Sequence, residues 1–88
     1  MTKKKLKLYR YCRHRIAIGK GNENDLATVE EVESFIAAIR GVDIVTHDII
    51  AARYLDGCSW AKVASITNST PDACRVAADR YIFKSQKN

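Results

Sequence analysis

The chain has 88 residues, 47% of them hydrophobic, with one proline, four glycines and a formal net charge of +5. This length suits a single domain with one modest core, and the composition argues against intrinsic disorder. No apolar run approaches the length of a membrane span, and the basic N-terminus lacks the apolar stretch of a signal peptide. The three cysteines show no short pairing, which argues against a disulfide scaffold. We therefore expect a cytoplasmic protein.

Charge is distributed unevenly along the chain. Residues 1–20 contain eight Lys or Arg and no acid, residues 21–56 contain eight acids against two arginines, and residues 57–88 contain five basic residues against two acids. Basic segments attract phosphates and acidic segments are repelled by them. We therefore expect both ends of the chain to approach a nucleic acid and the middle to face away. The alternative for the Lys3–Lys5 run is a solvated tail.

Residues 1–25 are expected to form a basic N-terminal segment and linker. The pattern of residues 3–18 fits two structures. A helix would carry one stripe of Leu8, Tyr11, Cys12, Arg15 and Ile16, whereas a strand would align Leu6, Leu8 and Arg10. Glycines at 19 and 21 interrupt the pattern, and the polar stretch to Asp25 predicts the linker.

Residues 26–88 predict a helical domain. Thr28 and Glu31 match a capping box, which predicts a helix from Thr28 to about Arg40, ended by Gly41. A further helix is predicted from about Thr46 to Leu55. The side chains that it would turn toward the core are Ile49, Ile50, Ala52 and Tyr54.

Residues 59–83 predict two short helices joined by a tight turn. Ser59 is a good N-cap for the first helix, and Asn68 tolerates the left-handed conformation that such a turn needs. Thr70 and Pro71 have the character of an N-cap and a first helical residue. The predicted fold class is thus all-α, a small domain of four to five helices with a C-terminal helix-turn-helix at 59–83, the kind of unit that reads DNA.

The densest motif is the run Arg53-Tyr54-Leu55-Asp56-Gly57, followed by Ser59-Trp60 and Val63-Ala64. It resembles the core of phage and Gram-positive helix-turn-helix proteins that are similar to the promoter-reading fourth region of primary sigma factors. The resemblance covers about residues 35–83, with Asn68 in place of the usual glycine and Thr67 and Ser69 in place of apolar residues. It implies a DNA-binding fold, a role in transcription regulation and RNA polymerase as a partner.

The second helix of the unit would enter the major groove and bury Cys74, Ala78 and Tyr81. Arg75 is our leading candidate for a base contact because arginine donates two hydrogen bonds to guanine; the alternative is a salt bridge with Asp72 or Asp79. The full set of predicted base contacts is Asp72, Ala73, Arg75, Val76 and Asp79.

Phosphate contacts are predicted near the helix starts and along the basic C-terminal end. They are Ser59, Lys62, Ser69, Thr70, Arg80 and Lys84, with Lys87 extending the same surface. Trp60 is expected to be a core residue rather than a DNA stacker, and Arg53 a structural residue that pairs with Asp56 or with an acid of the second helix.

Other functions have little support in the sequence. No short-spaced set of zinc ligands and no complete phosphate-binding loop occurs, so we expect no metal, no cofactor and no enzyme activity. Two alternatives to a transcription regulator stay open. One is a DNA-recognition subunit of a phage packaging or recombination complex, and the other is a protein-interaction domain that has lost DNA binding. A single recognition helix is short for genomic specificity, so a homodimer or a larger partner is expected.

Overall fold

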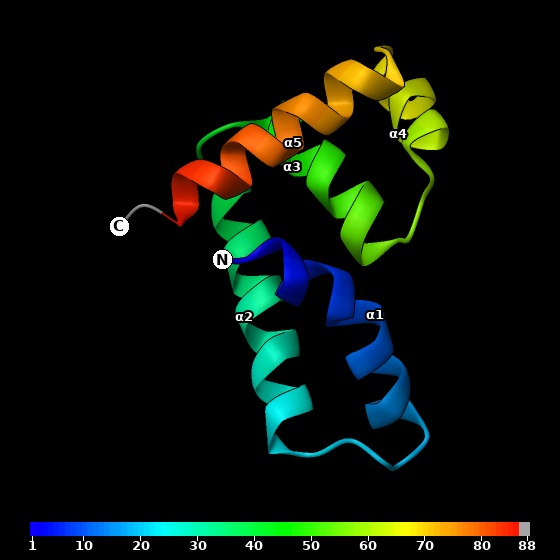
Figure 1. Ribbon diagram of the computed structural model, residues 1–88, viewed down its shortest axis with the longest axis vertical. Coiled ribbons are helices and arrows are strands. Elements are labelled where there is room, and N and C mark those ends of the chain that lie inside the picture. The colour runs from blue at the N-terminus through cyan, green and yellow to red at the C-terminus, as the bar shows by residue number, and fades with distance from the viewer. Residues whose placement is uncertain (87–88) are drawn as a thin grey trace.

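Helices make up most of the computed structural model, which describes residues 1–86 (Figure 1). The order is α1 (Lys3–Ala17), α2 (Glu23–Arg40), α3 (Ile44–Ile50), η1 (Ala51–Leu55), α4 (Trp60–Thr67) and α5 (Pro71–Ser85). The segment η1 is a π-helix that continues α3 without a break, and no strand occurs within the described range. The all-α class is confirmed, and residues 3–17 are helical rather than extended.

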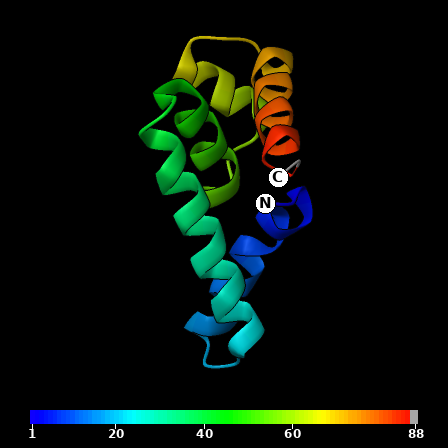
Figure 2. The same cartoon turned by 90° about the vertical axis from the view of Figure 1, so that its left-hand side faces the viewer.

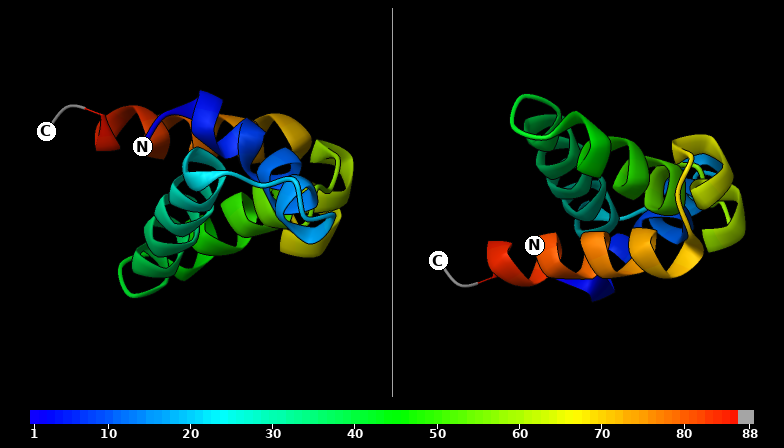
Figure 3. Two further views of the ribbon diagram at one scale, coloured as in Figure 1. Left: turned by 90° about the horizontal axis from the view of Figure 1, so that it is seen from below. Right: turned by 90° about the horizontal axis from the view of Figure 1, so that it is seen from above.

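Helices α1 and α2 form an antiparallel hairpin, and α3 leads from its end into the C-terminal half (Figures 1 and 2). Helix α5 forms one edge of the molecule, with α4 beside its beginning (Figure 3). The end of α5 returns to the start of the chain, where the Ser85 hydroxyl, which donates to the Ile82 carbonyl at 2.7 Å, lies 3.5 Å from the Met1 carbonyl. Within residues 1–86, no helix is both long and apolar enough to cross a bilayer.

One hydrophobic core draws on all of these helices. Leu6 of α1, Ile36 of α2, Ile50 of α3, Val63 of α4 and Ala78 of α5 are each at most 1% exposed and belong to the same cluster. The core therefore does not divide at residue 25, where we expected a basic segment and linker to give way to a separate helical domain. The N-terminal helix is part of the domain.

The buried face of α1 differs from the predicted stripe. Leu6, Tyr9 and Cys12 are buried, whereas Leu8 and Tyr11 are 40% and 58% exposed. The acidic helix α2 explains the difference, because its carboxylates pair with polar side chains of α1 and so fix which side of α1 faces α2. Lys5 Nζ lies 2.7 Å from Glu31 Oε2, and Tyr9 Oη and Arg13 Nη1 donate to Glu33 Oε2 at 2.6 and 3.1 Å.

The start of α2 was predicted wrongly. The helix begins at Glu23, because Asn22 and Asp25 form the capping box that we expected from Thr28 and Glu31. Asn22 Oδ1 accepts from the Asp25 amide at 2.9 Å, and Asp25 Oδ2 accepts from the Asn22 amide at 3.1 Å. Arg15 Nε also donates to Asp25 Oδ2 at 2.9 Å, and these hydrogen bonds hold the pKa of Asp25 below its usual value.

The helix predicted from Thr46 begins two residues earlier, at Ile44. Asp43 caps it, since its carboxylate accepts from the Thr46 amide at 3.1 Å and from the Thr46 hydroxyl at 2.7 Å. Its predicted core residues are confirmed: Ile49, Ile50, Ala52 and Tyr54 are all buried.

Candidate nucleic-acid interface

The predicted starts of the last two helices and the predicted end of the first are confirmed. Ser59 Oγ accepts from the Lys62 amide at 3.1 Å and opens α4, and Thr70 Oγ1 accepts from the Ala73 amide at 3.2 Å and opens α5. Asn68 is left-handed, with φ 55° and ψ 49°, and ends α4. Helix α5 runs to Ser85, two residues beyond the predicted end. We call α4, the turn 68–70 and α5 the two-helix unit.

Small side chains let α4 and α5 pack closely. Val63 and Ala64 of α4 are buried, as are Cys74 and Ala78 of α5. The hydroxyl of Thr67 lies 3.4 Å from Cys74 Sγ and donates to the Val63 carbonyl at 2.9 Å, so this polar side chain is satisfied between the helices. The packing holds the beginning of α5 rigidly against α4.

The third core position of α5 was assigned incorrectly. Ile82 is 2% exposed and fills the position that we predicted for Tyr81. Tyr81 is only half-buried and packs its ring against Phe35 of α2, with the ring centroids 6.0 Å apart. Tyr81 comes one residue before the core position and so lies on the flank of α5 that faces α2. There its amphipathic ring can keep the hydroxyl near water.

Four of the five predicted base-contact residues lie exposed on the first turns of α5: Asp72, Ala73, Arg75 and Val76. Asp79, the fifth, does not point outward as expected. It is half-buried against α1, with Oδ1 3.1 Å from Lys3 Nζ and Oδ2 3.7 Å from Arg75 Nη1. The Lys3 contact is ionic only, because Oδ1 is buried and its geometry with the ammonium does not make a hydrogen bond.

The predicted phosphate contacts are exposed but do not form one continuous surface. Ser59 and Lys62 lie at the start of α4, and Ser69 and Thr70 lie beyond its end, roughly 12 Å away along an eight-residue helix. Arg80 and Lys84 line a shallow pocket with Asp43 at the start of α3. Lys87 lies outside the described residues.

Arg75 and Arg80 consequently occupy different flanks of α5. Five residues separate them, which corresponds to about 140° around the helix axis. The Arg75 flank faces α1 through Asp79 and Lys3, and the Arg80 flank faces the start of α3. Between the flanks, Asp72, Ala73 and Val76 form the outermost strip of the helix.

Trp60, the first residue of α4, and Arg53 of η1 connect the two-helix unit to the rest of the domain. Trp60 is partly buried against the core, and its ring meets Tyr54 edge-on with centroids 6.5 Å apart. The Arg53 guanidinium lies 4.8 Å from the centre of the Trp60 ring, and its Nη1 donates to the Cys58 carbonyl at 3.0 Å. Arg53 is therefore structural as predicted, but its partners are a ring and a carbonyl rather than an acid.

Lys3 is the residue near this surface that the sequence prediction missed. We treated the Lys3–Lys5 run as either a phosphate-binding segment or a solvated tail, yet Lys3 pairs with Asp79 and Lys5 with Glu31. A signal existed in Asp79 of α5, since a carboxylate inside a predicted recognition helix needs a cation nearby. Lys3 lies 76 residues from Asp79 in sequence and Lys5 lies 26 residues from Glu31, so periodicity could not identify either pair.

Comparison of the chain with protein-family models, with curated proteins and with solved structures found no match.

Proposed function

We propose that the protein binds double-stranded DNA through the two-helix unit and acts in transcription regulation. The observation that carries this proposal is the exposed strip Asp72, Ala73 and Val76 at the beginning of a helix whose position is fixed by a cap and a close-packed neighbour. A recognition helix needs such an arrangement, because its first turns must reach base edges while its other face stays anchored. In the described residues, no other element covers this strip.

Arg75 fits the role of base reader in this proposal. Its side chain is 49% exposed, and it pairs with the Asp79 carboxylate at 3.7 Å. An exposed ion pair four residues apart on a helix is worth only about 0.3–0.5 kcal/mol, so DNA can release Arg75 at little cost. Ala73 and Val76 would contact thymine methyl groups, and Asp72 would accept from a cytosine amine.

A second candidate is a protein-interaction domain. Three apolar side chains of the two-helix unit are exposed: Ile66 at 56%, Val76 at 42% and Phe83 at 58%. A protein partner such as RNA polymerase, which the sigma-like resemblance implies, would bury such side chains, as would the subunits of a packaging or recombination complex. The acids Asp72 and Asp79 weaken the attraction of α5 for phosphates and favour this second reading.

The experiment that separates these functions begins with selection of bound duplexes from a random pool, with the mass of the protein measured on the same sample. The preferred duplex and a scrambled duplex are then titrated at two salt concentrations with the parent, with Arg75→Ala and with Arg13→Ala. Arg13 is a matched control, because it pairs with Glu33 on the surface of the α1–α2 hairpin and its loss changes the charge equally.

We expect Arg75→Ala to lose roughly 1–3 kcal/mol on the preferred duplex and to relax the preference at one base position. Arg13→Ala should weaken both duplexes slightly and equally. Failure of the parent to bind any duplex at low salt would reject DNA binding and leave the protein-interaction domain.

A further inference from the structure

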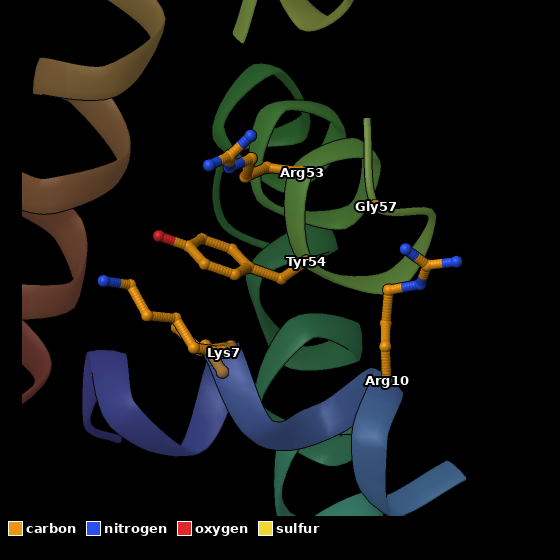
Figure 4. A pocket seen from close by; sticks show the side chains of 6 residues that line it. Lys7, Arg10, Arg53, Tyr54 and Gly57 are labelled. Atoms are coloured by element: carbon orange, nitrogen blue, oxygen red, sulfur yellow. The ribbon is translucent and has the colours of Figure 1, made fainter. Parts of the chain in front are cut away.

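A cavity of about 240 Å³ opens between α1 and η1, on the side of the domain below α4 (Figure 4). It is lined by Leu6, Lys7, Arg10, Arg53, Tyr54 and Gly57. We call it the basic pocket, because three of these six residues are cations and none is an acid. None of Lys7, Arg10 or Arg53 belongs to the ion pairs found among residues 1–86.

The secondary structure brings the cations together. Lys7 and Arg10 are three residues apart and share one face of α1. Arg53 and Tyr54 are adjacent in the π-helix η1, and both line the pocket. Short π-helical segments frequently lie at functional sites. The neighbouring face of α1 behaves differently, since its Lys5 and Arg13 are paired with acids of α2.

The side chains of the pocket are held in place before any ligand arrives. Arg53 is fixed by the Cys58 carbonyl and the Trp60 ring, which leaves its remaining N–H groups able to donate elsewhere. Arg10 lies directly against Gly57, where φ is +73° and a Cβ atom would collide with the guanidinium. In Figure 4, the Tyr54 hydroxyl, the Lys7 amino group and the Arg53 guanidinium point to one side, and the Arg10 guanidinium lies beside Gly57 on the other side of Tyr54.

Clustered cations without a counter-ion do not stabilise a fold. Like charges repel, and the repulsion is relieved only when an anion enters. The negative charge that acts on Tyr54 is that of Asp79, which is already engaged by Lys3 and Arg75. Burial raises the pKa of Tyr54, so its hydroxyl stays protonated and can donate a hydrogen bond. The pocket thus offers donors of three kinds and no carboxylate.

The chemistry of these donors selects the anion. Guanidinium groups match the oxygen atoms of a phosphate with two parallel hydrogen bonds, and a lysine ammonium adds a point charge. The volume is below the roughly 300–1,000 Å³ of pockets for drug-sized ligands, so the pocket suits a small group rather than a whole nucleotide. We propose that the basic pocket binds a phosphate group, carried either by a nucleic-acid backbone or by a free phosphate compound.

The test uses the full chain and inorganic phosphate as the probe, with binding followed by amide chemical shifts. Arg10→Ala and Lys7→Ala are compared with Lys20→Ala, which removes the same charge from the exposed connection between α1 and α2. Loss of one charge-assisted hydrogen bond should weaken phosphate binding roughly tenfold in each pocket variant. Lys20→Ala should stay within about twofold of the parent.

A second arm identifies the source of the phosphate. If a duplex supplies it, Arg10→Ala lowers duplex affinity and reduces the slope of log affinity against log salt by about 0.9, whereas Lys20→Ala does so less. If a free phosphate compound is the ligand, duplex affinity stays unchanged while phosphate binding is lost. Both results support the pocket, and neither depends on Arg75 reading bases.

Two results would overturn the proposal. One is equal binding of phosphate and of duplex by the parent, Arg10→Ala and Lys7→Ala. The other is a loss of phosphate affinity for Lys20→Ala as large as the loss for Arg10→Ala and Lys7→Ala, because binding would then follow net charge rather than the pocket.

Discussion

Asp79 is the residue whose replacement tests our view of α5 most sharply. Its carboxylate lies between two cations, 3.1 Å from Lys3 Nζ and 3.7 Å from Arg75 Nη1, and one of its oxygens is buried without a hydrogen bond. Asn keeps the shape of the side chain and removes the charge. The change Asp79→Asn therefore releases Arg75 and Lys3 together and takes an anion away from the edge of the proposed DNA-binding surface.

The size of the effect follows from the exposure of the partners. The side chains of Lys3, Arg75 and Asp79 are 43%, 49% and 32% exposed, so solvent screens both pairs and each contributes about 0.2–1 kcal/mol. Removal of a half-buried negative charge, which is costly to desolvate, offsets part of the loss. We expect Asp79→Asn to destabilise the domain by no more than about 1 kcal/mol, a fall of the thermal midpoint of roughly 4–8 °C at most.

Duplex affinity should move in the opposite direction. Release of Arg75 from its helical ion pair alone raises affinity about twofold, and the freed Lys3 adds a further cation near phosphates. The assay is titration of the preferred duplex at several salt concentrations. Glu30→Gln on α2 is the matched control, because Glu30 is exposed and its loss changes the net charge equally.

The comparison between the two variants decides the outcome. A gain for Asp79→Asn that exceeds the gain for Glu30→Gln supports α5 as the DNA-reading helix. Equal gains would mean that only net charge matters. A loss of affinity for Asp79→Asn would refute the reasoning, because Asp79 would then position the helix rather than restrain Arg75.

Three further predictions concern stability. Trp60→Ala should lower the free energy of unfolding, measured in urea, by roughly 2–3 kcal/mol. This is less than the roughly 3–5 kcal/mol of a fully buried aromatic, because the ring is only partly buried. A loss under about 0.5 kcal/mol would reopen a DNA-stacking role. Asn68→Ala should cost about 1–2 kcal/mol through its left-handed φ of 55°, whereas Asn68→Gly should not, and equal thermal midpoints would contradict the strain. Asp25→Asn should lower the thermal midpoint at pH 7, and the difference from the parent should shrink as the pH falls below about 4. The lowered pKa of Asp25 means that its stabilisation is fully present above the ordinary value near 4 and is lost as the pH falls through the lower folded value, so a difference that does not change with pH would show a loss of packing instead.

The last two helices could be predicted from the sequence because their signals are local. Ser59, Asn68 and Thr70 each act within four residues, through a side chain that caps an amide or a backbone that ends a helix. Such hydrogen bonds need no knowledge of the rest of the fold. The neighbouring error, Tyr81 for Ile82 in the core, arose because both residues satisfy a helical spacing from Ala78 and only packing against Phe35 decides between them.

The first two helices could be predicted only in part because their signals are long-range. Two capping boxes compete at the start of α2, and Arg15 favours the earlier one by bonding both Asp25 and the Lys20 carbonyl, each at 2.9 Å. That arginine belongs to another helix, so the spacing of Thr28 and Glu31 gave no warning. The buried face of α1 differs from the predicted stripe for the same reason, since hydrogen bonds to acids of α2 rather than apolar periodicity decide which side of α1 faces α2.

Ion pairs between helices decide which of the basic residues remain without a counter-charge. In sequence, the first twenty residues form one basic segment. In the structure, four of their cations form ion pairs with acids: Lys3 with Asp79, Lys5 with Glu31, Arg13 with Glu33 and Arg15 with Asp25. Lys7 and Arg10 are left to face Arg53 in the basic pocket. A net charge of +5 is therefore not spread evenly over the surface. The basic pocket gathers Lys7, Arg10 and Arg53, and the Arg80 flank of α5 carries Arg80 and Lys84. On our proposals, a phosphate-bearing partner meets the protein at one or both of these places.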